Sequence, residues 1–452
     1  MQVSRLSSQC PERDHMAAHA SLIDFRQREP WQHVAAFREN LAGCVEYYAG
    51  LWTGTPCNPP TPGHAFSLEE QRRNEREMGR LIGLIEKKLS DCPDDAFKRE
   101  AWRERLLHEV QKVAGERLGY PRSHLRIIFS PAYLSVTRAF VHKARMFDRT
   151  ITPEALSQAL RNVWVMNWIQ MFLGRELSVS PSVFAYSLLY PYTDNFLDQS
   201  DVAPGDKAAL NRDLKLRLAG GEVQARGPRD RAIFDLIGMI ECEYPRGEFP
   251  EVSESLLAIH AGQVKSLLQQ GESPSLGPGQ TLRVSIEKGG ASVLADGYLV
   301  AGGLTKGDAA ICFGLGVLLQ LFDDLQDLES DLAAKRWTIF SSRVGRSPLD
   351  GTTCRLYWYM DRVLASAARD SSSRRGVLTD LLRKNCLYLM LRALAQSSRF
   401  YSAEYLKRME SFSPLRFRYL EEQGRAAESR YATLVGTLLA RRNVSSIFDL
   451  LD

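Results

Sequence analysis

The segment Gly316-Val-Leu-Leu-Gln320-Leu-Phe-Asp323-Asp324-Leu-Gln-Asp327 places carboxylates at the end of a long apolar run. Asp323 and Asp327 are four residues apart, so in a helix their side chains project from one face, about one turn from each other. No Lys or Arg occurs between Asp308 and Lys335 to neutralise them. We therefore predict a largely buried helix whose carboxylates need a partner from elsewhere.

A second acidic cluster with the same spacing, Asp194-Asn-Phe-Leu-Asp198, lies 129 residues upstream of the first and is also flanked by apolar sequence. One such spacing alone is typical of a solvated helix face. Two apolar-flanked clusters favour a metal site instead, because buried like charges repel each other and lose hydration unless a cation binds them. Mg²⁺ prefers oxygen ligands and completes its shell with water and substrate phosphate. We predict a diphosphate site with more than one Mg²⁺, whose candidate ligands are Asp194, Asn195, Asp198, Asp323, Asp324 and Asp327, with Asn195 and Asp324 as ligands or as supports for them.

The composition is that of a globular, cytoplasmic protein. Its 452 residues, 44% of them hydrophobic, can build one large domain with an extension, or two domains. Lys plus Arg number 58 against 54 Asp plus Glu, a near balance that argues against nucleic-acid binding. No apolar stretch reaches the roughly 18 to 20 residues of a membrane span. The eight cysteines form no C-x-x-C pair, which disfavours a zinc ribbon or a disulfide framework.

Helical periodicity dominates the chain, so we predict an all-α fold. Residues 1–20 are expected to be disordered, and residues 21–130 to form an N-terminal helical extension. That extension is interrupted by a Pro-rich loop at 53–63. After the loop, Ser67 and Glu70 form a possible capping box at a helix start. Residues 131–452 are predicted to be one large helical domain, in which polar or Gly- and Pro-bearing breaks separate the helices at 219–230, 271–280 and 344–353.

The segment from Gly316 to Asp327 resembles the G-x-x-x-Q-x-x-D-D-x-x-D helix of trans-isoprenyl diphosphate synthases, which belong to the class I isoprenoid synthase superfamily. Lys288-Gly-Gly-Ala-Ser-Val-Leu is similar to their lysine-bearing helix of small residues, and Lys335-Arg336-Trp-Thr to the basic loop beyond the second motif. The resemblance implies a helical bundle around a central apolar cavity, with residues 131–452 as the catalytic domain. It also implies that Lys288, Lys335 and Arg336 bind diphosphate and that Gln320 lines the cavity.

The sequence after the first cluster favours a cyclase over a chain-elongating enzyme. Elongating synthases continue with Arg-Arg-Gly, whereas this chain reads Gln199-Ser-Asp-Val-Ala-Pro-Gly-Asp206. The segments 192–198 and 287–297 are more similar to bacterial large-terpene synthases of the tetraprenyl-β-curcumene synthase type. This resemblance implies a terpene cyclase that ionises one linear polyprenyl diphosphate with Mg²⁺. The alternatives are a prenyltransferase, either elongating or condensing like squalene and phytoene synthases, and a non-catalytic helical interaction protein. A homodimer is one possible assembly.

Aromatic residues precede the first cluster at helical spacing. Tyr190 and Tyr186 lie four and eight residues before Asp194 and share its face if the helix continues through Pro191. A carbocation needs a dry cavity, and aromatic faces attract cations. We therefore predict that both tyrosines line the cavity and set the length of prenyl chain that fits.

Overall fold

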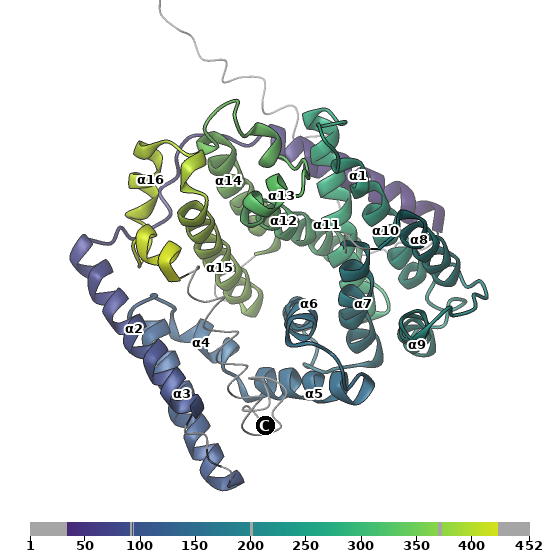
Figure 1. Cartoon of the computed structure of the whole chain (residues 1–452), viewed down its shortest axis with the longest axis horizontal. Coiled ribbons are helices and arrows are strands. Elements are labelled where there is room, and N and C mark those ends of the chain that lie inside the picture. The colour runs from purple at the N-terminus through teal and green to yellow at the C-terminus, as the bar shows by residue number, and fades with distance from the viewer. Residues whose placement is uncertain (1–33, 91–92, 94, 199–201, 369–372, 424–452) are drawn as a thin grey trace, which may run out of the picture.

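The computed structural model describes residues 34–90, 93, 95–198, 202–368 and 373–423. Within these ranges the chain folds into sixteen α-helices and three short 3-10 helices without a strand (Figure 1). The described backbone forms one isolated antiparallel bridge, between Gln270 and Arg336. The predicted all-α class is confirmed. The segment predicted to be disordered, residues 1–20, lies outside the described residues.

Seven consecutive helices begin with proline, which is favourable there because the first helical N–H has no partner and the fixed φ of proline suits the helix. Ser130 and Thr152 cap the first two of them by accepting hydrogen bonds from backbone N–H groups. The seven helices are α5 (Pro131–Phe147), α6 (Pro153–Phe172), α7 (Pro181–Asp198), α8 (Pro204–Leu218), α9 (Pro228–Glu243), α10 (Pro250–Ser266) and α11 (Pro278–Ala301).

Helix α11 lies at the centre of the bundle and packs against α1, α6, α7, α10 and α12. The breaks predicted at 219–230, 271–280 and 344–353 agree with the helix boundaries to within a few residues. The chain continues after α11 with α12 (Lys306–Gln326), α13 (Leu328–Ala333), α14 (Asp350–Ala367), α15 (Arg374–Gln396) and α16 (Ala403–Glu410); the 3-10 helices are η1 (Leu267–Gln269), η2 (Ser341–Arg343) and η3 (Ser398–Phe400).

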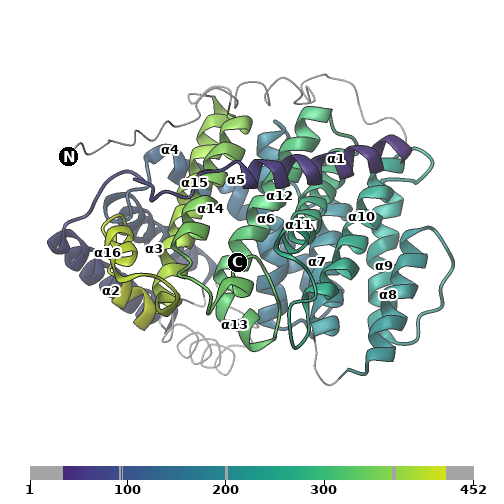
Figure 2. The ribbon, with the colours of Figure 1, turned by 90° about the horizontal axis from the view of Figure 1, so that it is seen from above.

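Helix α1 (Val34–Thr53) is part of the same core. It runs across α10, α11 and α12 (Figure 2). The Tyr48 hydroxyl donates to the Ala310 carbonyl at 2.9 Å, and its ring stacks on Phe313 with 5.7 Å between centroids. Tyr48 is buried, so this helix stabilises the bundle from the far end of the sequence.

Helices α2 (Leu68–Ser90) and α3 (Ala96–Glu116) form a hairpin that projects from the bundle and connects to it through α4 (Arg122–Ile128) (Figure 1). The predicted capping box is confirmed, because Ser67 N–H donates to Glu70 at 2.7 Å and Glu70 N–H donates to the Ser67 hydroxyl at 3.3 Å. The predicted loop at 53–63 is non-helical after Thr53. The extension predicted at 21–130 is thus divided into a core helix and a projecting hairpin.

Candidate functional site

Helices α11 and α12 cross with their backbones in contact at glycines. A Cβ atom built on Gly316 would lie 2.1 Å from the carbonyl oxygen of Gly289, and one built on Gly289 would lie 2.6 Å from the carbonyl oxygen of Gly316. No side chain fits at either position in so densely packed an interior. Lys288 directly precedes Gly289, and its charge acts on Asp323 and Asp324. The crossing therefore brings the lysine to the acidic end of α12.

The carboxylates at this end lie close enough to disfavour one another's ionised form. The Asp323 side chain is exposed, but the protein atoms around it desolvate the carboxyl in part and raise its pKa. Asp327 is exposed as well, and partial desolvation, followed by the charge of Asp323, raises its pKa to about 6. Burial, followed by the charges of Asp324 and its neighbours, raises the pKa of Asp331 on α13 to about 8. A bound cation would relieve this repulsion.

Asp324 points the other way, into the interface between α11 and α12. Its Oδ1 accepts a hydrogen bond from Gln320 Nε2 at 2.8 Å, and its Oδ2 accepts one from the Ser285 hydroxyl at 3.0 Å. The residue is 4% exposed, and burial raises its pKa to about 7. These hydrogen bonds make Asp324 a support for the end of α12, which is one of its two predicted roles. Gln320, which the resemblance assigns to the cavity, is instead the hydrogen-bond donor to Asp324.

Three basic side chains surround the same carboxylates. Lys288 from α11, Arg336 from the segment after α13 and Arg161 from α6 each lower the pKa of Asp323 and Asp327 through their charge. Lys288 and Arg336 are predicted from the sequence, whereas Arg161 is not. Arg161 is the single basic residue of the otherwise mostly apolar helix α6. A single basic residue on a mostly apolar helix is a candidate for a specific charged partner, so Arg161 could have been predicted from the sequence.

The side chains of Lys335 and Arg336, which are predicted to act together, have different partners. Arg336 forms the bridge to Gln270, and the Trp337 N–H donates to the Gln269 carbonyl at 2.7 Å. Lys335 is a turn residue with a positive φ of 52°, directly before this bridge. Arg336 lies with Nη1 3.8 Å from Oδ1 of Asp331, whereas the Lys335 ammonium forms an ion pair with Glu272. Lys335 thus pairs with Glu272 in this structure, and its role in diphosphate binding stays a prediction.

The first acidic cluster lies at the C-terminal end of α7. The helix continues through Pro191, so Tyr186, Tyr190 and Asp194 share one helical face. The side chains of Asp194, Asn195 and Asp198 lie outside the described residues, and their metal-binding role stays a prediction.

An apolar pocket of about 90 Å³ adjoins this face, between α6, α7, α8, α10 and α11. Its wall includes Tyr186 and Tyr190 and, on α11, Ser292, which lies one helical turn after Lys288. The pocket thus extends from the lysine-bearing helix to the aromatic face of α7. The remaining lining residues are Asn162, Leu189, Thr193, Asn211, Leu214, Leu218, Leu256, Ile259, His260 and Gln263.

A buried polar cluster lies behind the pocket wall. Nδ2 of Asn162 donates to the Ser187 hydroxyl and to Oδ1 of Asp296, each at 3.2 Å. Asp296 is 0% exposed, and burial raises its pKa to about 8. Its Oδ2 has no hydrogen-bond partner among the described residues. Burial therefore favours the neutral acid form of Asp296.

We predict that Asp296→Asn becomes more stable relative to wild type as the pH rises. The folded state keeps the Asp296 proton up to about pH 8, whereas the unfolded chain loses it near pH 4. The unfolded state binds fewer protons in this window, so wild type loses up to about 1.4 kcal/mol of stability per pH unit through this group. Urea unfolding of both proteins at pH 6 and pH 8 measures the difference. An identical pH dependence would contradict a protonated Asp296.

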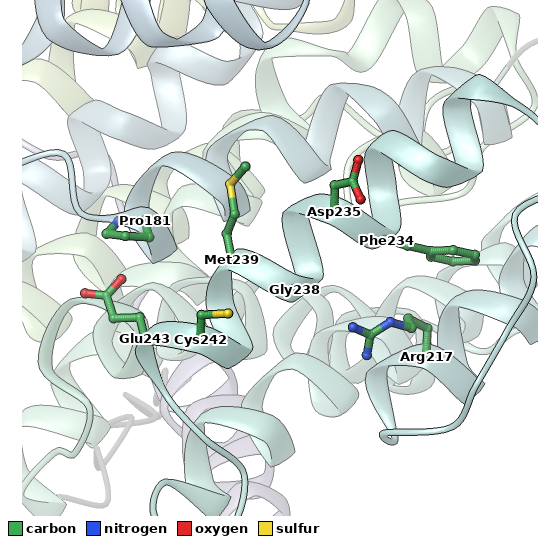
Figure 3. A pocket seen from close by; sticks show the side chains of 8 residues that line it. All are labelled: Pro181, Arg217, Phe234, Asp235, Gly238, Met239, Cys242 and Glu243. Atoms are coloured by element: carbon green, nitrogen blue, oxygen red, sulfur yellow. The ribbon is translucent and has the colours of Figure 1, made fainter.

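A larger hollow, of about 850 Å³, lies on the outer surface along α9 and contains none of the predicted site residues. Figure 3 shows that most of its side chains come from α9, with Arg217 and Pro181 from neighbouring helices. Arg217 forms two hydrogen bonds to Glu241, at 2.8 and 2.5 Å, and Glu243 accepts one from the Ser182 backbone N–H at 2.7 Å. These charged groups already serve the protein's own structure, so the groove is a weaker candidate site.

No protein-family model, curated protein or solved structure matches this chain. In the described part of the chain, no helix is both long enough and apolar enough to cross a membrane. Across the same residues, no three His, Cys, Asp or Glu side chains are arranged to hold a metal ion. The functional interpretation therefore depends on the residues of the site itself.

Proposed function

We propose that this protein is a class I isoprenoid synthase of the terpene-cyclase type, which ionises one linear polyprenyl diphosphate and releases pyrophosphate. One observation carries the proposal. Mutually repelling carboxylates and three basic side chains lie together at the acidic end of α12, near an apolar pocket. Carboxylates with cations suit a metal-bound diphosphate, and the pocket suits a hydrocarbon chain.

The described carboxylates fit Mg²⁺ by their chemistry. Asp323 and Asp327 offer hard oxygen ligands one turn apart, and their raised pKa values reflect partial desolvation and repulsion that a divalent cation would offset. Asp194 and Asp198 are the proposed ligands from α7. When bound, Mg²⁺ would neutralise the charge that develops on the departing pyrophosphate.

The other residues of the site bind, orient and exclude water. Lys288, Arg161 and Arg336 are placed to donate charge-assisted hydrogen bonds to diphosphate oxygens. Tyr186 and Tyr190 on α7 line the pocket, and aromatic side chains can stabilise a cation through their faces. The pocket of about 90 Å³ is smaller than the roughly 300 Å³ or more of typical ligand sites, so substrate entry requires these side chains to move. Tyr190, which is 42% exposed, has room to do so.

Incubation with C10 to C35 allylic diphosphates and Mg²⁺, with and without isopentenyl diphosphate, tests the proposal. Pyrophosphate and a hydrocarbon from a single substrate support the cyclase. A longer diphosphate formed only with isopentenyl diphosphate identifies an elongating prenyltransferase, and joining of two identical substrates identifies a condensing one. Absence of both turnover and diphosphate binding supports the non-catalytic interaction protein.

Lys288→Ala is expected to weaken binding of Mg²⁺-pyrophosphate by at least about tenfold, since a charge-assisted contact to phosphate is worth more than a neutral hydrogen bond. Lys335→Ala is the matched control, because its ammonium is engaged with Glu272. Titration calorimetry on the three proteins gives the affinities. Equal losses in both variants would remove Lys288 from a specific diphosphate contact.

Tyr190→Ala is expected to shift substrate preference toward longer diphosphates, because loss of the ring enlarges the pocket next to the acidic end of α7. Competition between substrates that differ by one isoprene unit measures the preference. Trp164→Ala is a suitable control, because this exposed aromatic residue on α6 does not line the pocket. An unchanged chain-length profile in Tyr190→Ala would place the end of the cavity elsewhere.

A further inference from the structure

The side-chain amide of Asn162 is oriented by two neighbouring helices. A primary amide has two N–H donors, and those of Asn162 reach Ser187 on α7 and Asp296 on α11, each at 3.2 Å. These two hydrogen bonds turn the amide nitrogen toward α7 and α11. The fold, and not the solvent, therefore sets which way the amide points.

The amide nitrogen of Asn162 is hydrogen-bonded to other described residues, but the side-chain carbonyl oxygen is not. The side chain lines the apolar pocket, and no described residue donates a hydrogen bond to this oxygen. The oxygen is not fully buried. The space beside the Asn162 side chain is the pocket. A hydrogen-bond acceptor without a donor thus faces a site of low polarity. Water can bind this oxygen in the free protein, but a substrate chain that displaces the water leaves the oxygen unsatisfied unless the chain carries positive charge.

We propose that the Asn162 carbonyl oxygen stabilises positive charge on the hydrocarbon chain of the substrate, and that Ser187 and Asp296 are positioning residues that hold it toward the pocket. This inference rests on the function proposed above, because positive charge arises on the chain when the carbon–oxygen bond breaks and its electron pair leaves with pyrophosphate. No bond forms to Asn162. A fixed dipole in a site of low dielectric stabilises a cation without reorganisation at the moment of reaction.

Asn162, Ser187 and Asp296 lie at some distance from the proposed diphosphate site. They could therefore stabilise positive charge on a part of the hydrocarbon chain remote from the leaving group. Asp296 follows Lys288 by eight residues on α11, which is about 12 Å along the helix axis. Ser292 lies between them and lines the pocket. The neutral acid form of Asp296 suits its role, since an ionised carboxylate next to the pocket would compete with Asn162 for the cation.

Two variants separate this inference from the proposed function. Asn162→Leu keeps the side-chain size and removes the dipole, so among the products that form, the share of acyclic or less cyclised compounds should rise. Asp296→Leu frees the Asn162 amide and should cause the same shift. Asp296→Asn keeps an acceptor at Oδ1 and should restore the wild-type products. Gas chromatography of the products and a pyrophosphate assay provide both readouts.

Asn167→Leu is the matched control on α6, because this buried amide has no hydrogen-bond partner among the described residues and does not line the pocket. Its product spectrum should equal that of wild type. An unchanged spectrum in Asn162→Leu, or an equal shift in Asn167→Leu, would overturn the inference and leave the cyclase proposal standing. Failure of wild type to release pyrophosphate from any allylic diphosphate would overturn both.

Discussion

Asp323→Ala is expected to lower the rate of pyrophosphate release by at least about 10²- to 10³-fold, the loss typical of removing one group that stabilises developing charge. Asp323 lies where the charges of Lys288, Arg161 and Arg336 converge. Asp194→Ala on α7 should have a similar effect, because we propose that both helices hold the same metal-bound diphosphate. Chelation of Mg²⁺ should abolish the activity, and added Mg²⁺ should restore it.

Measurements of stability show whether Asp323→Ala loses activity because the site is changed or because the protein unfolds. The Asp323 side chain is exposed and is not part of the buried face of α12. The Asp323→Ala variant should therefore keep its helical circular dichroism and a melting temperature close to that of wild type without Mg²⁺. Glu329→Ala is the control, since this nearby acid on α13 pairs with Arg399 at the surface. A wild-type rate in Asp323→Ala at saturating Mg²⁺ would contradict the proposed site.

Gly316→Ala should destabilise the protein by about 3 kcal/mol or more, at the upper end of the range for overpacked cores. The added methyl group would lie 2.1 Å from the Gly289 carbonyl oxygen, which is backbone and cannot turn aside, so α11 and α12 must separate. Separation would also move Lys288 away from the end of α12. The variant should therefore lose activity beyond what its lower stability explains.

Gly238→Ala is the matched control for this substitution. Gly238 lies inside α9, and a Cβ atom there meets no heavy atom within 4 Å. Alanine in a helix interior is favoured over glycine by roughly 0.5–1 kcal/mol, so this variant should gain stability. Urea unfolding of the three proteins gives the comparison. Equal midpoints for Gly316→Ala and wild type would show that the crossing tolerates a wider separation.

Several features of the fold follow from local sequence alone. Apolar spacing predicts the helices, and prolines and the Ser67–Glu70 capping box mark where they begin. The four-residue spacing of Asp323 and Asp327 places both carboxylates on one face, and the same spacing aligns Tyr186 and Tyr190. These predictions succeed because they depend on helix stereochemistry within a few turns of one segment.

Only the tertiary structure determines which of these residues lie together at the candidate site. Asp324 is a neighbour of Asp323 in the sequence, yet packing of α11 against α12 turns it inward to Ser285. Lys335 pairs with Glu272, whereas its neighbour Arg336 lies beside Asp331. Arg161 reaches the site from α6, and α1 enters the core from the N-terminal region. These outcomes depend on contacts between residues far apart in the chain, and the spacing of residues within one helix carries no information about such contacts.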